Sequence, residues 1–220
     1  MGSLRLSPIQ HAKRGIPWLT IGVVAMPAAA LIVCAFLFQD HPAAWSLLRA
    51  GLLIWATAAA FLLDDPPAPV VTATPRSPSW WHAARLLAAL PLLAVPVLAA
   101  SLWAINRPDI HVPGLAVITV AVALTVLAGA AVARRLGRNA PGELVAGGAI
   151  LIVLFLLIRP VSIHGVPLLP WPGHPGWAAT TRLWLILAAV AVLTIAIAGW
   201  WTRKPTRKRL ATDPARPVAR

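Results

Sequence analysis

The chain has 220 residues, of which 59% are hydrophobic and only 11% are charged, and its formal net charge is +13. Soluble domains average about 25% charged residues, so this composition excludes an ordinary solvated surface and indicates an integral membrane protein. The positive charge does not indicate nucleic-acid binding, because the basic residues lie at the ends of apolar runs rather than along one face of a soluble fold.

Apolar runs of membrane-spanning length recur along the chain, since about 20 residues cross a hydrocarbon core of roughly 30 Å. We predict an all-α polytopic membrane protein whose transmembrane domain, residues 17–201, contains six transmembrane helices. The predicted spans are 17–38, 43–63, 86–105, 113–133, 143–158 and 183–201. Residues 1–16 form a short N-terminal segment, and residues 202–220 form a basic tail that we expect to be disordered.

The distribution of basic residues predicts the orientation of these spans. Fifteen of the 19 Lys and Arg lie in the N-terminal segment, in the 2–3 and 4–5 connections, and in the tail. By the positive-inside rule, both termini are cytoplasmic, in a bacterial plasma membrane. The bilayer is the first expected partner, and the basic tail is expected to attract anionic lipid headgroups.

No pattern in the sequence predicts an enzyme or a bound cofactor. The chain lacks the G-x-x-x-x-G-K-[ST] pattern that cradles nucleotide phosphates. Its six acidic residues all lie at span ends, in connections or in the tail, so no carboxylate is available at mid-membrane for a proton relay.

Four of the six histidines lie on the predicted exterior side. Neutral imidazoles are common transition-metal ligands, so a metal-binding membrane protein is one alternative function. The spacing shows no H-x-x-H or H-x₃-H pair, and loop histidines are usually solvated. The weak metal-ligand candidates are His41, His111, His164 and His174.

Arg49 is the charge that lies clearly inside a predicted span, roughly 9 Å from its exterior end. Its side chain either snorkels outward, with Asp40 as a possible partner, or faces an internal cavity and meets an anionic substrate or headgroup. Pro91 and Pro96 bend the third span. We treat these two prolines and Arg49 as substrate-path candidates, although structural bending explains the prolines equally well.

The cytoplasmic connection between the second and third spans, residues 64–85, carries five prolines between Asp64 and Ser79, which forbid a continuous helix. The sequence SWWHAAR follows, and it suits a short interfacial helix. Trp80, Trp81 and Arg85 are therefore candidates for contact with a partner protein, and a stiff linker is the equally good alternative.

The segment VSIHGVPLLPWPGHPGW, residues 161–177, is too apolar for an ordinary solvated loop. The fifth span before it is short, at about 24 Å, and Arg159-Pro160 stops its helix after Ile158. Non-helical backbone is tolerated at membrane depth where protein buries it, so we predict a re-entrant or interfacial hairpin. Its deeper part would be Val166, Pro167, Leu168 and Leu169, with Trp171 and Trp177 as headgroup anchors.

These features together resemble the membrane subunit of an ABC-2-type exporter, a family with six spans, cytoplasmic ends and a re-entrant element between spans five and six. The stretch FLLDDPPAPVVTATPRSPSWW is also similar to one in small actinobacterial membrane proteins, some associated with ABC transport. The resemblance implies a separate ATPase partner, contact through the 2–3 connection and a homodimer. A non-catalytic membrane scaffold or regulatory protein is the alternative.

Overall fold

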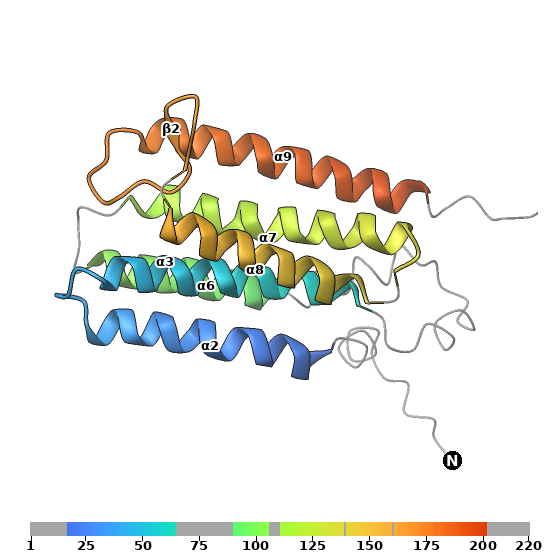
Figure 1. The fold of residues 1–220 in the computed structure, drawn as a ribbon, viewed down its shortest axis with the longest axis horizontal. Helices are drawn as coiled ribbons and strands as arrows, with labels where there is room; N and C mark the ends of the chain where they lie inside the picture. Colours follow the sequence, from blue (N-terminus) through green and yellow to red (C-terminus); the bar gives the residue numbers. More distant parts are fainter. Residues whose placement is uncertain (1–16, 65–89, 106–110, 139, 160, 202–220) are drawn as a thin grey trace, which may run out of the picture.

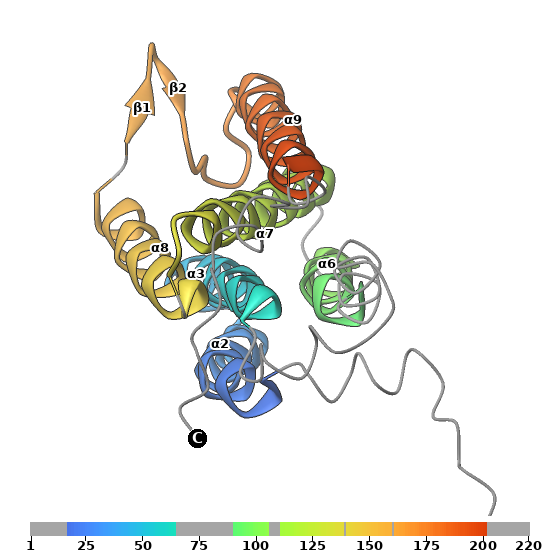
Figure 2. The same ribbon diagram turned by 90° about the vertical axis from the view of Figure 1, so that its right-hand side faces the viewer.

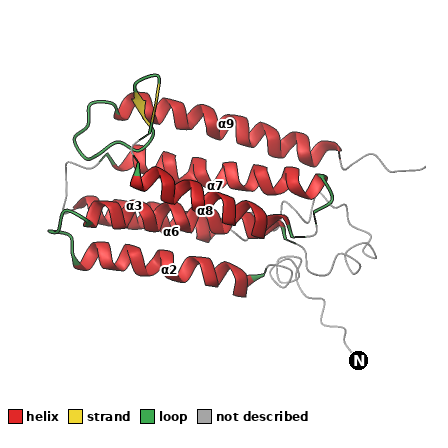
Figure 3. Ribbon diagram, viewed as in Figure 1, coloured by secondary structure: helices red, strands yellow, loops and turns green. Residues whose placement is uncertain are grey.

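The computed structural model describes residues 17–64, 90–105, 111–138, 140–159 and 161–201. This part of the chain is mostly helical, with one small pair of strands (Figures 1 and 3). The helices are α2 (Trp18–Leu37), α3 (Ala44–Thr57), its 3₁₀ continuation η1 (Ala58–Leu63), α6 (Leu90–Ile105), α7 (Val112–Arg135), α8 (Pro141–Ile158) and α9 (Trp177–Trp201). The strands are β1 (Ser162–Ile163) and β2 (Val166–Pro167).

The prediction of a helical protein with several membrane-spanning segments is confirmed at this level. Within the described residues, five helices are long and apolar enough to cross a bilayer, and α3 together with η1 counts as one of them. The remaining helix, α6, contributes a shorter apolar stretch, Ala94–Ile105. The N-terminal segment, nearly all of the 2–3 connection with Trp80, Trp81 and Arg85, and the basic tail lie outside the described residues.

The helices run side by side, and the run α3–η1 lies at the centre of the bundle (Figures 1 and 2). It contacts α2, α6, α7 and α8, and 72% of its apolar window is buried inside the protein. The corresponding fraction is 22% for α8 and 17% for α9. The apolar outer faces of α8 and α9 match a lipid environment, because water would not solvate them.

Close packing of α2 against α3 depends on a small residue. A Cβ atom built on Gly51 would lie 2.6 Å from Ile32 Cγ1 and 2.8 Å from the carbonyl oxygen of Ala28. Small residues at such crossings let two backbones approach closely in a membrane, where van der Waals contact favours association. Gly51 therefore fixes the position of the helix that carries Arg49.

The two ends of the bundle differ in chemistry. We call the end with the segment 159–176 and the first turns of α3, α7 and α9 the loop end, and the end where η1 and α7 finish and α8 begins the basic end. The start of α2 and the finish of α9 lie at the basic end (Figure 1). That this end faces the cytoplasm stays a prediction.

At the basic end, a short turn joins α7 to α8. Gly137 has a φ of 81°, and its N–H donates to the Arg134 carbonyl at 3.0 Å while the Arg138 N–H donates to the Ala133 carbonyl at 3.2 Å. This pair of bonds is the Schellman motif, in which a glycine adopts the left-handed conformation and ends a helix. The motif turns the chain back toward α8, which begins at Pro141.

The segment after α8 is a β-hairpin followed by a folded loop (Figures 2 and 3). Ser162 pairs with Pro167 and Ile163 pairs with Val166 in an antiparallel register. The two turn residues, His164 and Gly165, have φ values of 49° and 79°, and two successive positive φ angles are typical of the type I′ turn that joins short hairpins. Entry of this hairpin into a bilayer stays a prediction.

Candidate functional site

Two charged side chains are buried among the described residues, and both belong to the central run. Arg49 lies in α3, at the loop end, and is 6% exposed; Asp64 follows η1 at the basic end and is 9% exposed. Burying a charge is costly unless a partner compensates it, so both positions are candidates for a specific role.

The Arg49 guanidinium lies between the central helix and the segment 159–176. Its Nη2 donates to the carbonyl oxygen of Leu169 at 3.1 Å, across 120 residues of sequence. Its central carbon lies 5.7 Å from the centre of the Trp45 ring and 5.5 Å from that of Trp171, which is cation–π range. Arg49 thus turns inward rather than snorkelling, and Asp40 is not among its contacts.

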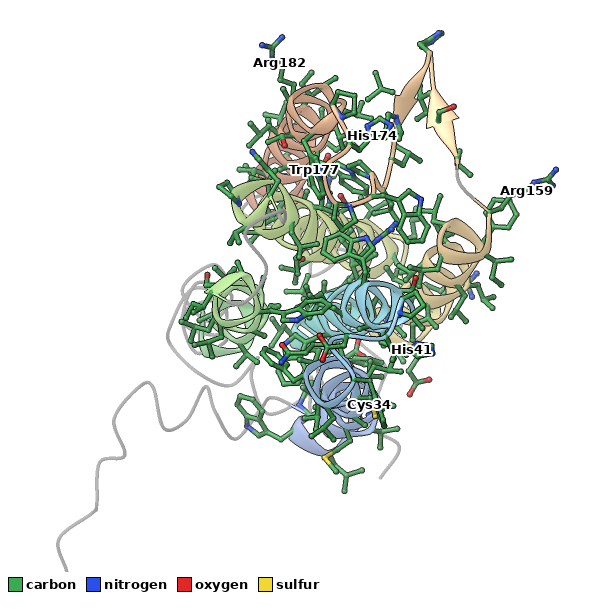
Figure 4. All side chains as sticks on the ribbon, turned by 90° about the vertical axis from the view of Figure 1, so that its left-hand side faces the viewer. Cys34, His41, Arg159, His174, Trp177 and Arg182 are labelled. Carbon is green, nitrogen blue, oxygen red and sulfur yellow. The ribbon has the colours of Figure 1, made fainter. Side chains whose placement is uncertain are left out.

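A cavity of about 250 Å³ opens beside Arg49. It lies between α3, the last turn of α8 and the segment 167–171. Its apolar wall consists of Leu156, Leu157, Ile158 and Val161, and its polar side chains are Arg49, Ser46 and His174. In Figure 4 Arg159 and Arg182, the other described arginines at this end, point away from the bundle.

Three side chains from one face of α9 hold the same segment in place. Trp177 Nε1 donates to the Trp171 carbonyl at 3.0 Å, Thr180 Oγ1 donates to the Pro167 carbonyl at 2.6 Å, and Trp184 Nε1 donates to the Leu168 carbonyl at 2.9 Å. With Arg49, four of the carbonyls between residues 167 and 171 accept side-chain bonds. The cavity wall is therefore a preorganised part of the fold.

Aromatic rings form a row beneath this segment. Phe36, Trp103, Trp45, Trp177 and His111 follow one another with centroid separations of 6.2, 6.2, 6.4 and 5.4 Å. Trp177 was predicted to be a headgroup anchor, but it is 6% exposed and is the first residue of α9. Its ring fills the space against His111 and Trp45, so only Trp171, 54% exposed, has the accessibility of an anchor.

Two members of this row bury a donor without an acceptor. Trp45 Nε1 and Trp103 Nε1 have no hydrogen-bond partner among the described residues. An unsatisfied buried N–H costs about 1–3 kcal/mol. The apolar area that each ring buries offsets this cost, which explains why a tryptophan is tolerated there.

The four histidines that were predicted to face the exterior support local backbone turns rather than one common centre. The Nδ1 atoms of His41, His111 and His174 accept from the N–H groups of Ala43, Gly114 and Gly176 at 3.2, 3.0 and 2.9 Å. His111 in this way caps the N-terminus of α7, as short polar side chains do. His164 occupies the hairpin turn. Within the described ranges, no three His, Cys, Asp or Glu residues lie close enough to hold a metal ion.

The substrate-path candidates Pro91 and Pro96 both lie in α6. Pro96 is fully buried, and it faces Trp55, Ala56 and Thr119 across a space too small for water. Pro96 thus packs α6 against its neighbours and adjoins no open route. The structure brings Arg49 together with the predicted hairpin residues Leu168 and Leu169, and it does not bring Pro96 to that site.

At the basic end, Asp64 accepts a bond from the Gly142 N–H at 2.7 Å and so caps the N-terminus of α8 from a different element. Arg134 Nη1 donates to the adjacent Leu63 carbonyl at 2.9 Å. Burial raises the pKa of the Asp64 carboxyl above its ordinary value, and Glu143 adds to the rise, whereas the Gly142 bond and Arg134 oppose it. Asp64 was not among the site residues predicted from the sequence.

The arrangement of the loop end is thus a preorganised cavity with one buried cation. No protein-family model, curated protein or solved structure matches this chain.

Proposed function

We propose that the chain is the membrane-spanning subunit of an ABC-type exporter that works with a separate ATPase. The observation that carries the proposal is the folded segment between the last two helices, α8 and α9. Residues 161–176 lie at the opposite end of the bundle from the start of α2 and the finish of α9. The permeases that the sequence resembles have a compact element at the corresponding place on their outer face.

The lack of a nucleotide-binding pattern and the position of the 2–3 connection support the same proposal. The chain has no nucleotide-binding pattern, so an exporter built from it needs a separate ATPase. The 2–3 connection leaves the bundle at Asp64, at the basic end, and it contains the predicted contact residues Trp80, Trp81 and Arg85. We propose that this end faces the cytoplasm of a bacterial plasma membrane, where ATP is available.

A non-catalytic scaffold is the second candidate, and the packing of the bundle favours it. Among the described residues, the core around Leu48, Leu52 and Leu53 is closed, and the space beside Pro96 admits no water. One copy therefore offers no evident route across the membrane. The exporter proposal accordingly includes a homodimer, in which the route would lie between two copies.

Purification from native membranes in mild detergent, with the bound proteins identified by mass spectrometry, tests the proposal. We expect an ATPase at a stoichiometric level. The triple variant W80A/W81A/R85A should lose it. Trp171→Ala is the matched control, because it removes an exposed tryptophan from the other end of the bundle and should keep the ATPase.

Two results would decide against an exporter. The first is the absence of any ATPase under conditions that preserve a known ABC complex. The second is recovery of the ATPase with the native chain at no higher level than with an unrelated membrane protein of the same cells; equal loss in the triple variant and in Trp171→Ala would instead decide against the coupling contact alone. Recovery of a stable non-ATPase complex would support the scaffold.

The proposed orientation has its own test. His164 lies exposed in the hairpin turn, so a cysteine placed there by His164→Cys, with Cys34→Ala to remove the native thiol, reports on the loop end. A membrane-impermeant maleimide should label this variant in intact cells. Labelling only after the cells are lysed would show that the loop end faces the cytoplasm, which is opposite to the proposed orientation.

A further inference from the structure

The charge of the Arg49 guanidinium has no counter-charge among the described residues. A guanidinium carries five N–H donors, and the structure assigns one bond to the Leu169 carbonyl. Two of the described carboxylates, Asp64 and Glu143, lie at the basic end. The third, Asp40, does not contact Arg49. A buried cation with donors to spare favours an anion at the same place.

The cavity supplies the space for that anion. Its volume of about 250 Å³ is equal to roughly eight water molecules at about 30 Å³ each. A phosphate or carboxylate group fits this volume, whereas a whole lipid does not. Ser46 and His174 line the same cavity and add polar groups that can bond an oxyanion.

The walls of the cavity indicate that the anion carries a hydrocarbon chain. Leu156, Leu157 and Ile158 of α8 form one side. Just before these residues on the same helix, toward the basic end, Leu154 and Phe155 are 42% and 53% exposed, so an acyl chain has an apolar surface to follow once it leaves the cavity. Arg49 lies about 7.5 Å along α3 from its first residue, Ala44, a depth that suits a headgroup better than a fully hydrated ion.

We propose that this cavity binds the oxyanion headgroup of an acyl-chain amphiphile, with Arg49 as the charged ligand. Arg49 forms charge-assisted bonds to the headgroup oxygens and keeps its bond to the Leu169 carbonyl. Trp45 and Trp171 flank the guanidinium and keep its plane in place. Binding needs only this chain, so it stands independently of the exporter proposal and of any ATPase.

Native mass spectrometry of the purified full chain in uncharged detergent tests the proposal. The probes are dioleoylphosphatidylglycerol, the zwitterionic dioleoylphosphatidylcholine and inorganic phosphate. We expect the phosphatidylglycerol to bind about tenfold or more tightly than the phosphatidylcholine, and Arg49→Met to lose about tenfold in affinity for it. Arg159→Met, which removes an exposed arginine at the same end, should stay within about twofold.

A second variant keeps the test valid if Arg49→Met does not fold. Ser46→Phe fills the cavity and leaves Arg49 and its bond to Leu169 in place, so it should also lose the lipid. Equal losses in Arg49→Met and Arg159→Met would overturn the site, because they would show general attraction between charges. If inorganic phosphate alone saturates the site and displaces the phosphatidylglycerol, the ligand does not need an acyl chain. This result would overturn the proposal of an amphiphile and indicate a site for free anions.

Asp109 is an acidic residue that precedes α7 and lies outside the described residues. A further variant therefore tests whether its carboxylate, rather than a lipid headgroup, is the counter-charge of Arg49. The proposal expects Asp109→Asn to leave binding of the phosphatidylglycerol unchanged. A gain of about tenfold in this variant would show that the Asp109 carboxylate competes for the place assigned to the headgroup, and it would contradict the proposal.

Discussion

The two ends of the central run, α3–η1, each bury one charge, and they compensate it differently. At the basic end, Asp64 accepts a bond from the first turn of α8 and lies near Arg134 and Glu143. At the loop end, Arg49 contacts one carbonyl and two indole rings. Roughly 25 Å of helix separates the two residues. Both side chains join the central run to a distant part of the sequence.

The difference indicates two different roles. Asp64 lies within a closed set of protein groups, because the Gly142 N–H and Arg134 favour its charged form and offset part of the cost of burial. The Arg49 charge is stabilised only in part, by a neutral carbonyl and by ring faces, and it adjoins a cavity. We therefore assign a structural role to the basic end and a binding role to the loop end.

The largest effect is expected at the basic end. Asp64→Leu removes the acceptor of the Gly142 N–H and should lower the free energy of unfolding by about 2 kcal/mol. Asp64→Asn keeps a carbonyl acceptor and should lose much less. Denaturation in mixed micelles, followed by far-ultraviolet circular dichroism, measures both. Equal losses in the free energy of unfolding for the two variants would contradict the capping role of Asp64.

A smaller effect is expected from the tryptophans of the loop end. Trp184→Phe leaves the Leu168 carbonyl without its donor and should cost about 1 kcal/mol. Trp103→Phe removes a donor that has no partner among the described residues, so its cost should be clearly lower. The same denaturation experiment compares them. A larger loss for Trp103→Phe would mean that its N–H has an acceptor outside the described residues.

Arg49→Met should change stability less than Asp64→Leu when no anionic lipid is present. The variant loses the bond to the Leu169 carbonyl but no longer buries an uncompensated cation, so we expect a net change within about 1 kcal/mol. The denaturation series is run here in uncharged detergent after lipid removal. A loss as large as that of Asp64→Leu would make Arg49 mainly a structural residue.

The smallest expected effect is a pH dependence from Asp64. Because its pKa is raised in the folded state above the ordinary value of 3.8, the folded chain binds this proton more tightly than the unfolded chain. The contribution of this group to stability therefore falls as the pH rises from about 3.8 through the raised pKa, and it is constant above that range. Melting temperatures across this window should show a steeper fall for the native chain than for Asp64→Asn. Identical profiles would contradict the assignment.

The length of the apolar runs made the helices predictable, since few residues interrupt them and the bilayer sets their length. Arg49 could be recognised because a charge inside a span is rare. The partner of Arg49 could not be predicted, because the Leu169 carbonyl lies 120 residues away and every residue type supplies a backbone carbonyl oxygen. Asp64 was missed for the same reason, since its partner is the backbone N–H of Gly142.

Trp177 shows why the details of the segment between α8 and α9 were less predictable. Interfacial and buried tryptophans look alike in a sequence, because both have apolar neighbours and a donor that needs a partner. A usable signal was nevertheless present. Trp177, Thr180 and Trp184 follow a spacing of three and then four residues, which places them on one helix face, and that face holds the segment.

The most direct test of the contrast between the two ends is the melting temperature of the purified chain with and without added dioleoylphosphatidylglycerol, with dioleoylphosphatidylcholine as the reference lipid. We expect the anionic lipid to raise the melting temperature of the native chain, of Arg159→Met and of Asp64→Asn, and we expect Arg49→Met to lose this increase. An undiminished increase in Arg49→Met would contradict the assignment of the binding role to the loop end.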